Sequence, residues 1–302
     1  MPDRVDGSVD PGDDFGPMTD NGSQQAVIVT CGEMSCPEVV AVAGGEVAVF
    51  SARSPSKQTG NEDAAAIVPA ANRGTILAVA DGLGGQRSGA EAAELAVRAV
   101  AGCVTAANPV TGLRSAILDG FEQANRSVND LGVGAATTLA AVEIDDSTIR
   151  PYHVGDSTIL VAGQRGRIEL LTVSHSPVGY AVEAGLLDEH EAIHHEDRHI
   201  VSNIVGSPEM RIEVGRSLTL KPHDTLLIGS DGLFDNLHVA EVVEVIRKGK
   251  LAVVAAALAE ACRQRMQEPE PGHPSHPDDL TFLIYRRSQE ARGTKRGQTT
   301  SM

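Results

Sequence analysis

Cysteine is scarce in this sequence, with only four in 302 residues: Cys31, Cys36, Cys103 and Cys262. They form no pattern typical of a disulfide framework. A structural zinc site would need a second pair of ligands beside Cys31 and Cys36, and the sequence offers none. We therefore interpret the cysteines as reduced thiols and expect a cytoplasmic protein.

Basic side chains are scarce relative to acidic ones. The 25 lysines and arginines stand against 41 aspartates and glutamates, and the formal net charge is −16. A surface with this charge repels the phosphates of nucleic acids and of anionic membranes. The composition therefore argues against a nucleic-acid partner, against a membrane-surface protein, and against a nuclease or phosphodiesterase with a polyanionic substrate.

Long apolar runs are absent as well. No run reaches the roughly 20 residues that a membrane-spanning helix needs. The first 22 residues hold six aspartates and one arginine, where a signal peptide would need a basic end followed by an apolar stretch. We expect a soluble protein.

The remaining composition suits one folded domain with tails, because 41% of the residues are hydrophobic. We predict a disordered acidic tail at 1–25, a linker or added strand at 26–45, one domain at 46–287 and a polar tail at 288–302. Within the domain, residues 175–208 interrupt the pattern of strands and are predicted to form a surface flap.

Two hydrophobic periods alternate along the domain. Helical spacing marks 92–103 and 117–131, and two more helices are expected at 239–247 and 251–266. Between them, strand-like runs follow one another without intervening helices, which is typical of antiparallel meanders. Helices in two pairs and strands in two groups predict two sheets packed on each other with the helices outside.

Acidic motifs stand at the ends of the apolar runs. There are five: Asn61-Glu62-Asp63, Asp81-Gly82, Gly155-Asp156-Ser157, Asp231-Gly232 and Asp278-Asp279. Taken singly, each Asp-Gly is more often a plain turn than a metal site. Clustered carboxylates without matching basic residues repel each other, and a bound Mg²⁺ or Mn²⁺ ion usually relieves this repulsion. Two such ions can activate a bridging water and clamp a phosphoryl oxygen.

The order of these motifs resembles a known family, the metal-dependent protein Ser/Thr phosphatases of the protein phosphatase 2C type. The resemblance runs from about Glu46 to Arg287 and rests on "GNEDA", "VADGLGGQRSGAEAAELA", "GAATTLAAV", "HVGDSTILV", "LLIGSDGLFDN" and "PDDLTFLIY". The segments "VGYAVEAGLLDEHEA" and "EDRHIVSNIVGS" are similar to the bacterial branch. This likeness implies an α+β fold, a four-layer αββα sandwich of two antiparallel sheets flanked by helix pairs.

The resemblance also implies roles for individual residues. Asp81 resembles the carboxylate that bridges two metal ions, with the Gly82 carbonyl beside it, and Asp231 and Asp278 resemble the ligands of the other ion. Asp156 with Asp231 matches a weaker third metal site. Glu62 and Asp63 match residues that act mainly through metal-bound waters. Asp279 stands where many members have Asn, so it is placed with them behind Asp278, although these two carboxylates could exchange roles.

Two positions depart from the family pattern. Leu83 stands where some members have a histidine proposed as general acid, so water is expected to protonate the leaving oxygen. Gln58 stands at the spacing of the arginine that grips the substrate phosphate in many members. Lys57 and Arg53 are the nearby cations that we expect to bind phosphate instead, and lysine would do so as a point charge.

The function implied is hydrolysis of phosphoserine and phosphothreonine in proteins. The expected centre holds two Mn²⁺ or Mg²⁺ ions with a bridging hydroxide, and no phosphoenzyme forms. Phosphorylated proteins are the expected partners, opposite a Ser/Thr kinase in a signalling pathway, and we expect a monomer. The alternative is a pseudophosphatase, a module of the same fold that binds phosphoproteins without turnover.

Overall fold

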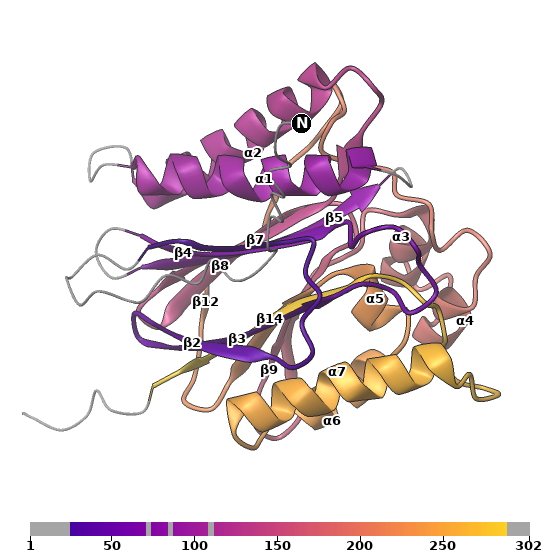
Figure 1. Cartoon of the computed structure of the whole chain (residues 1–302). Coiled ribbons are helices and arrows are strands. Elements are labelled where there is room, and N and C mark those ends of the chain that lie inside the picture. The colour runs from indigo at the N-terminus through magenta and orange to yellow at the C-terminus, as the bar shows by residue number, and fades with distance from the viewer. Residues whose placement is uncertain (1–24, 71–73, 84–86, 108–111, 289–302) are drawn as a thin grey trace, which may run out of the picture.

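The structure is a computed structural model that describes residues 25–70, 74–83, 87–107 and 112–288. The two predicted tails lie outside the described residues, apart from Gln25 and Ser288. Two sheets stack on each other, and a pair of helices covers the outer face of each (Figure 1). The predicted α+β sandwich of four layers is thereby confirmed.

The first sheet has eight strands, all of them antiparallel to their neighbours. Its main order is β1-β4-β5-β7-β8-β11, while β6 pairs with β5 and β12 with β8. The strands are β1 (Val27–Thr30), β4 (Asp63–Pro69), β5 (Thr75–Leu83), β6 (Ala136–Thr137), β7 (Leu139–Asp145), β8 (Thr148–Val154), β11 (Glu213–Val214) and β12 (Leu218–Thr219).

The second sheet has six antiparallel strands in the order β10-β9-β13-β14-β3-β2. They are β2 (Glu38–Val42), β3 (Gly45–Ala52), β9 (Thr158–Ala162), β10 (Ile168–Leu171), β13 (Thr225–Gly229) and β14 (Leu280–Arg287). The segment 26–45 thus contributes an edge strand to each sheet, β1 to the first and β2 to the second.

The helices divide between the two outer faces. On the first sheet lie α1 (Arg87–Thr105) and α2 (Leu113–Asp130), and on the second lie α6 (Val239–Ile246) and α7 (Leu251–Gln267) (Figure 1). The short helix α5 (Asp231–Phe234) follows β13 directly. The segment 175–208, called the flap below, contains α3 (Pro177–Glu183) and α4 (Glu189–Ile193).

The central strands are buried on both faces. Along β3, Val47 and Val49 pack between the sheets, whereas Ala48 and Phe50 pack toward α7. Because successive strand residues point to opposite faces, a strand buried on both sides needs a continuous apolar run, as "VAVF" shows. The acidic motifs lie at the ends of the strands. Within the described residues, no helix has the length and apolar character needed to cross a bilayer.

Candidate active site

Two of the predicted carboxylates meet within the first sheet. Asp63 begins β4 and Asp81 lies near the end of β5, and the register of the two strands places them directly opposite each other. The main chain of Asp81 is held firmly, because its N–H donates to Thr138 Oγ1 (3.0 Å) and its carbonyl accepts from the Thr138 N–H (2.8 Å). Backbone pairing therefore sets the position of both acids.

The second sheet places Asp231 near Asp63 and Asp81. Ser230, at the end of β13, donates its hydroxyl to Asp63 Oδ2 at 2.9 Å and so joins the two sheets. The next residue is Asp231, the first residue of α5. Asp63 Oδ1 and Asp231 Oδ1 are both buried without a hydrogen-bond partner among the described residues. Such buried, unpartnered carboxylate oxygens are unusual, because each would normally be hydrogen-bonded.

Asp278 and Asp279 occupy different environments although they are adjacent. Asp279 accepts the N–H groups of Ser54 and Glu62, each at 2.8 Å, and the Lys57 ammonium at 2.7 Å. Both of its oxygens are therefore occupied by protein donors. Within the described part of the chain, Asp278 accepts only the Asp279 N–H, through Oδ1 at 2.7 Å, and its carboxylate interacts electrostatically with the other acids.

The turn that carries Asp156 is tied to Asp81 through hydroxyl groups. Thr138 Oγ1 lies 2.7 Å from Ser157 Oγ, and Thr138 also contacts the main chain of Asp81. Gly155 has a φ of 102° and packs so closely on Thr138 that a Cβ would lie 2.7 Å from the threonine side chain. Only glycine fits this turn, which places Asp156 beside the other acids.

Burial and mutual repulsion act together on these carboxyls. Burial raises the pKa of Asp63, Asp81 and Asp231 well above the ordinary value for aspartate, and repulsion from neighbouring acids adds to the effect. Burial also raises the pKa of Asp156 to about 6, and the negative charges of Asp235 and Asp278 contribute to this increase. The pKa of Asp278 is raised chiefly by its burial as well.

This donor set suits hard divalent cations. The oxygens are all carboxylate or carbonyl oxygens, two of them are buried without a partner among the described residues, and the group repels itself as long as no cation is added. Mg²⁺ and Mn²⁺ prefer oxygen ligands of this kind. The residues present therefore fit a metal centre.

Gly82 lies where β5 meets the start of α1. Its N–H donates to the Glu62 carbonyl at 3.2 Å. A Cβ at Gly82 would lie 2.2 Å from the Gly89 carbonyl oxygen, and one at Gly89 would lie 2.7 Å from Glu62 Oε1. This close approach of two main chains requires glycine at both positions.

The predicted phosphate-binding cations are both engaged in ion pairs. Lys57 contacts Glu62 at 2.5 Å and Asp279 at 2.7 Å, and these partners raise its pKa despite its burial. Arg53 pairs with Glu33 at 3.1 Å and donates to the Thr59 carbonyl at 3.3 Å. Lys57 thus neutralises part of the acidic group from within the protein.

The structure adds Asp235 to the predicted acids. Burial raises the pKa of Asp235, and its charge in turn raises the pKa of Asp156 and Asp231. It accepts a hydrogen bond at 3.1 Å from Nε of Arg198, a flap residue. The only sequence signal for Asp235 was its place in "SDGLFDN", four residues after Asp231 and hence one helical turn away.

A second group of metal-ligating residue types lies beside the flap and consists of His153, His175 and Glu213. The two imidazole rings stack at 4.3 Å, so their in-plane lone pairs do not converge on one point. Both nitrogens of His175 are occupied, Nδ1 by the Gly155 N–H at 3.1 Å and Nε2 by Glu213 at 3.1 Å. Hydrogen bonding and stacking therefore account for this group without a metal ion.

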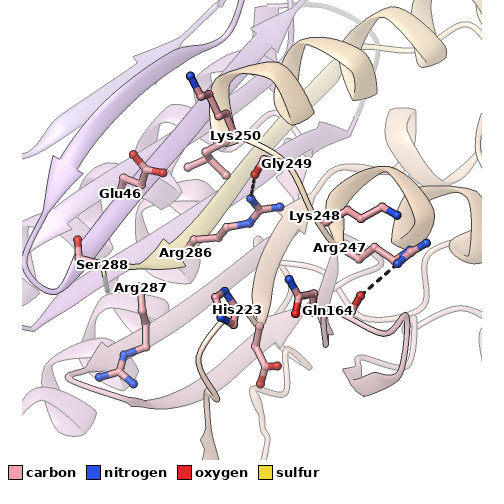
Figure 2. A pocket seen from close by; sticks show the side chains of 12 residues that line it. Glu46, Gln164, His223, Arg247, Lys248, Gly249, Lys250, Arg286, Arg287 and Ser288 are labelled. Atoms are coloured by element: carbon pink, nitrogen blue, oxygen red, sulfur yellow. Dashed lines mark hydrogen bonds between the residues drawn. The ribbon is translucent and has the colours of Figure 1, made fainter. Parts of the chain in front are cut away.

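A cavity of about 400 Å³ lies at the other end of β13 and β14, and it is basic (Figure 2). Arg286 donates there to the carbonyls of Ile246 and Gly249, and Arg247 pairs with Glu244 at 2.8 Å. Figure 2 shows Lys248 and Lys250 pointing away from each other. Arg286 thus holds the α6–α7 connection, and the cations around the cavity do not converge on a reacting group, so the acidic group remains the candidate site.

Comparison with known proteins agrees with this geometry. The family model described as protein phosphatase 2C matches residues 53–267. A putative protein phosphatase 2C-type protein of Streptococcus pyogenes is 32% identical over 184 residues, which cover 57% of this chain and 72% of the relative. Protein phosphatase PhpP of Streptococcus pneumoniae is also 32% identical, over 181 residues that cover 57% of this chain and 72% of the relative.

Solved structures share this fold. The serine/threonine phosphatase of S. agalactiae superposes with a TM-score of 0.70 at 27% identity, over 81% of this chain and 100% of that one. The catalytic domain of PstP, described in complex with two manganese ions, superposes with a TM-score of 0.60 at 23% identity, over 79% of this chain and 96% of that one. The chain belongs to the protein phosphatase 2C family of metal-dependent Ser/Thr protein phosphatases, and it is a hydrolase.

Proposed function

We propose that the acidic group formed by Asp81, Asp231, Asp278 and Asp156 is the catalytic centre, and that it hydrolyses phosphoserine and phosphothreonine directly with water. The observation that supports this most is that both sheets place carboxylates at one point, where Asp63 Oδ1 and Asp231 Oδ1 are buried without partners among the described residues. A purely structural role would leave this repulsion uncompensated.

The residues that would hold metal are those with available oxygens. We assign Asp81 and the Gly82 carbonyl to one ion, Asp81, Asp231 and Asp278 to the other, and Asp156 with Asp231 to a weaker third. When bound, two Mn²⁺ or Mg²⁺ ions would activate a water and neutralise charge on the phosphoryl group.

Other residues hold this arrangement in place. Asp63 is fixed by the Ser230 hydroxyl, while Asp279 and Lys57 fix the segment from Ser54 to Glu62. Glu62, Asp63 and Asp279 thus act on the centre indirectly, by holding the proposed ligands in position. Leu83 has no proton to give, so the leaving oxygen is protonated by water at the site.

The cysteines support direct hydrolysis without a phosphoenzyme. Burial raises the pKa of Cys31 and Cys103, and it raises the pKa of Cys262 to about 12. A thiol nucleophile needs a lowered pKa, so these thiols are poor candidates. All four cysteines are free, which favours a reducing compartment such as the cytoplasm.

The substrates in this proposal are phosphorylated proteins made by an opposing Ser/Thr kinase, and the enzyme acts on them as a monomer. The test measures hydrolysis of p-nitrophenyl phosphate and of a phosphothreonine peptide with Mn²⁺ and with EDTA. We expect turnover of both substrates with Mn²⁺ and none with EDTA. Full activity in EDTA would exclude the metal centre, and tight metal binding without turnover would favour the phosphoprotein-binding module.

A further inference from the structure

We propose that a cavity between the flap and the start of α6 is a substrate subsite that binds one large apolar side chain near the phosphorylated residue. This inference rests on the proposed function, because it names a feature of the phosphoprotein that the same site would recognise. The cavity measures about 210 Å³. It is smaller than pockets for whole small-molecule ligands, which usually measure about 300 Å³ or more.

The apolar part of the lining comes from both sides of the gap. Val178, Val182 and Ile193 belong to the flap helices, and Phe234 and Leu237 belong to the segment around α5. On the outer side, Leu171 keeps 37% of its surface exposed. Apolar surface that remains open to water in this way gains free energy when another apolar group covers it.

The hydroxyl groups in the lining are already hydrogen-bonded within the protein. Ser176 caps α3 by accepting the Gly179 N–H at 2.9 Å, and Ser174 lies 2.9 Å from the Ser176 hydroxyl. Thr172 accepts the Ile159 N–H at 2.9 Å. A polar ligand group would have to compete with these bonds, whereas an apolar group would not.

Two of the charged groups at the cavity are paired with each other. Arg198 donates to Asp235 at 3.1 Å, and the ring of His238 stacks on that of His190 with the centroids 5.9 Å apart. Glu189, on an exposed turn of α4, is the remaining acid in the lining. The lining therefore favours an apolar occupant over a charged one.

The cavity begins close to the proposed catalytic centre. Phe234 and Asp235 follow Asp231 by three and four residues, so they lie roughly 5 Å further along the helical rise. On the other side, Thr158 lines the cavity and its hydroxyl donates to the Asp156 carbonyl at 3.1 Å. An extended peptide advances about 3.3 Å per residue, so an apolar residue within about three positions of the phosphoresidue would reach it.

The first experiment needs no variant. Phosphothreonine peptides with alanine at every other position receive a single leucine at each position from three before to three after the phosphothreonine. We expect one position at which leucine raises kcat/KM by roughly tenfold over alanine. If no position favours leucine by twofold while the peptides and p-nitrophenyl phosphate are hydrolysed, the subsite is excluded and the proposed function stands. If none of these substrates is hydrolysed, both fail.

A variant then tests whether the preference for leucine arises in this cavity. Ala192 on α4 lines it, and Ala192→Phe would fill it, so the leucine and alanine peptides should become equal substrates. Ala184→Phe is the matched control, because Ala184 is an exposed flap residue outside the lining. The control should keep the leucine preference. A preference that survives in Ala192→Phe, with the variant folded by circular dichroism, would contradict the assignment.

Discussion

Asp63 and Asp81 lie directly opposite each other on β4 and β5, and burial raises the pKa of both carboxyls. Like charges at opposed positions in a sheet are destabilising. The Ser230 hydroxyl relieves Asp63 only in part, since Asp63 Oδ1 has no hydrogen-bond partner in the described part of the chain. The fold therefore maintains a locally unfavourable arrangement that added cations would relieve.

Removing one charge from this group should separate activity from stability. In Asp81→Asn and in Asp231→Asn, we expect Mn²⁺-dependent hydrolysis of p-nitrophenyl phosphate to fall by about 100-fold or more, because a proposed ligand is lost. In EDTA both variants should melt at a higher temperature than the wild type, because repulsion is reduced. Asp130→Asn, at an exposed position on α2, is the control and should change neither quantity.

Metal should stabilise the native state by binding to it. With Mn²⁺ at about 100 times its Kd, we expect the free energy of unfolding to rise by about 2.7 kcal/mol relative to EDTA. Thermal denaturation followed by circular dichroism measures this. The increase should shrink in Asp231→Asn, and an equal increase in that variant would show that the metal binds elsewhere.

A substitution of Lys57 tests whether this residue acts mainly through its ion pairs or through a contact with the substrate phosphate. Lys57→Gln leaves Glu62 and Asp279 without their cation, and we expect a loss of about 2 kcal/mol or more in the free energy of unfolding. Urea denaturation measures this loss. If Lys57 also binds the phosphate, KM for a phosphothreonine peptide should rise as well. A higher KM with unchanged stability would contradict the importance of the ion pairs.

Two glycines of α1, Gly89 and Gly102, should respond differently to substitution by alanine. Gly89→Ala places a Cβ 2.7 Å from Glu62 Oε1 and 3.0 Å from the Gly82 carbonyl oxygen, so we expect lower stability and lower Mn²⁺-dependent activity. Gly102→Ala is the control in the same helix, because no atom of the described residues lies within 4 Å of the added Cβ, apart from the chain neighbours and the backbone of the same helical turns. It should stabilise the protein by about 0.5–1 kcal/mol in thermal denaturation. Equal effects of the two substitutions would contradict the packing argument.

His153 should make stability depend on pH. Its burial, followed by the charge of the stacked His175, lowers its pKa from the ordinary 6.5, while the Val173 carbonyl and Glu213 oppose this shift. The neutral ring is therefore favoured in the native state. Its contribution to stability is present above about pH 6.5 and is lost as the pH falls from 6.5 through the lower native pKa, by at most about 1.4 kcal/mol per pH unit.

The measurement compares wild type with His153→Gln by urea denaturation between pH 5 and 8. The difference in the free energy of unfolding between the two proteins should shrink as the pH falls below 6.5. A wild-type advantage that grows on acidification would contradict a lowered pKa for His153.

Much of this protein follows from its sequence alone. The short apolar runs bounded by turn residues predicted two groups of strands. Their succession without helices predicted antiparallel sheets, and the two pairs of helical segments predicted the outer layers. The ordered acidic turns indicated the family, since turn chemistry alone does not require Asp at every strand end.

Only the tertiary structure decided which contacts each acid makes. Asp278 and Asp279 are adjacent and chemically identical, yet Asp279 is held by donors from Ser54 and Glu62, 225 and 217 positions away. The fold also brings Asp235 close to the other acids, and it places the Lys57 ammonium between Glu62 and Asp279. Hydrogen-bond partners and burial depend on contacts between distant segments, whereas periodicity in the sequence reports only which face of an element is buried.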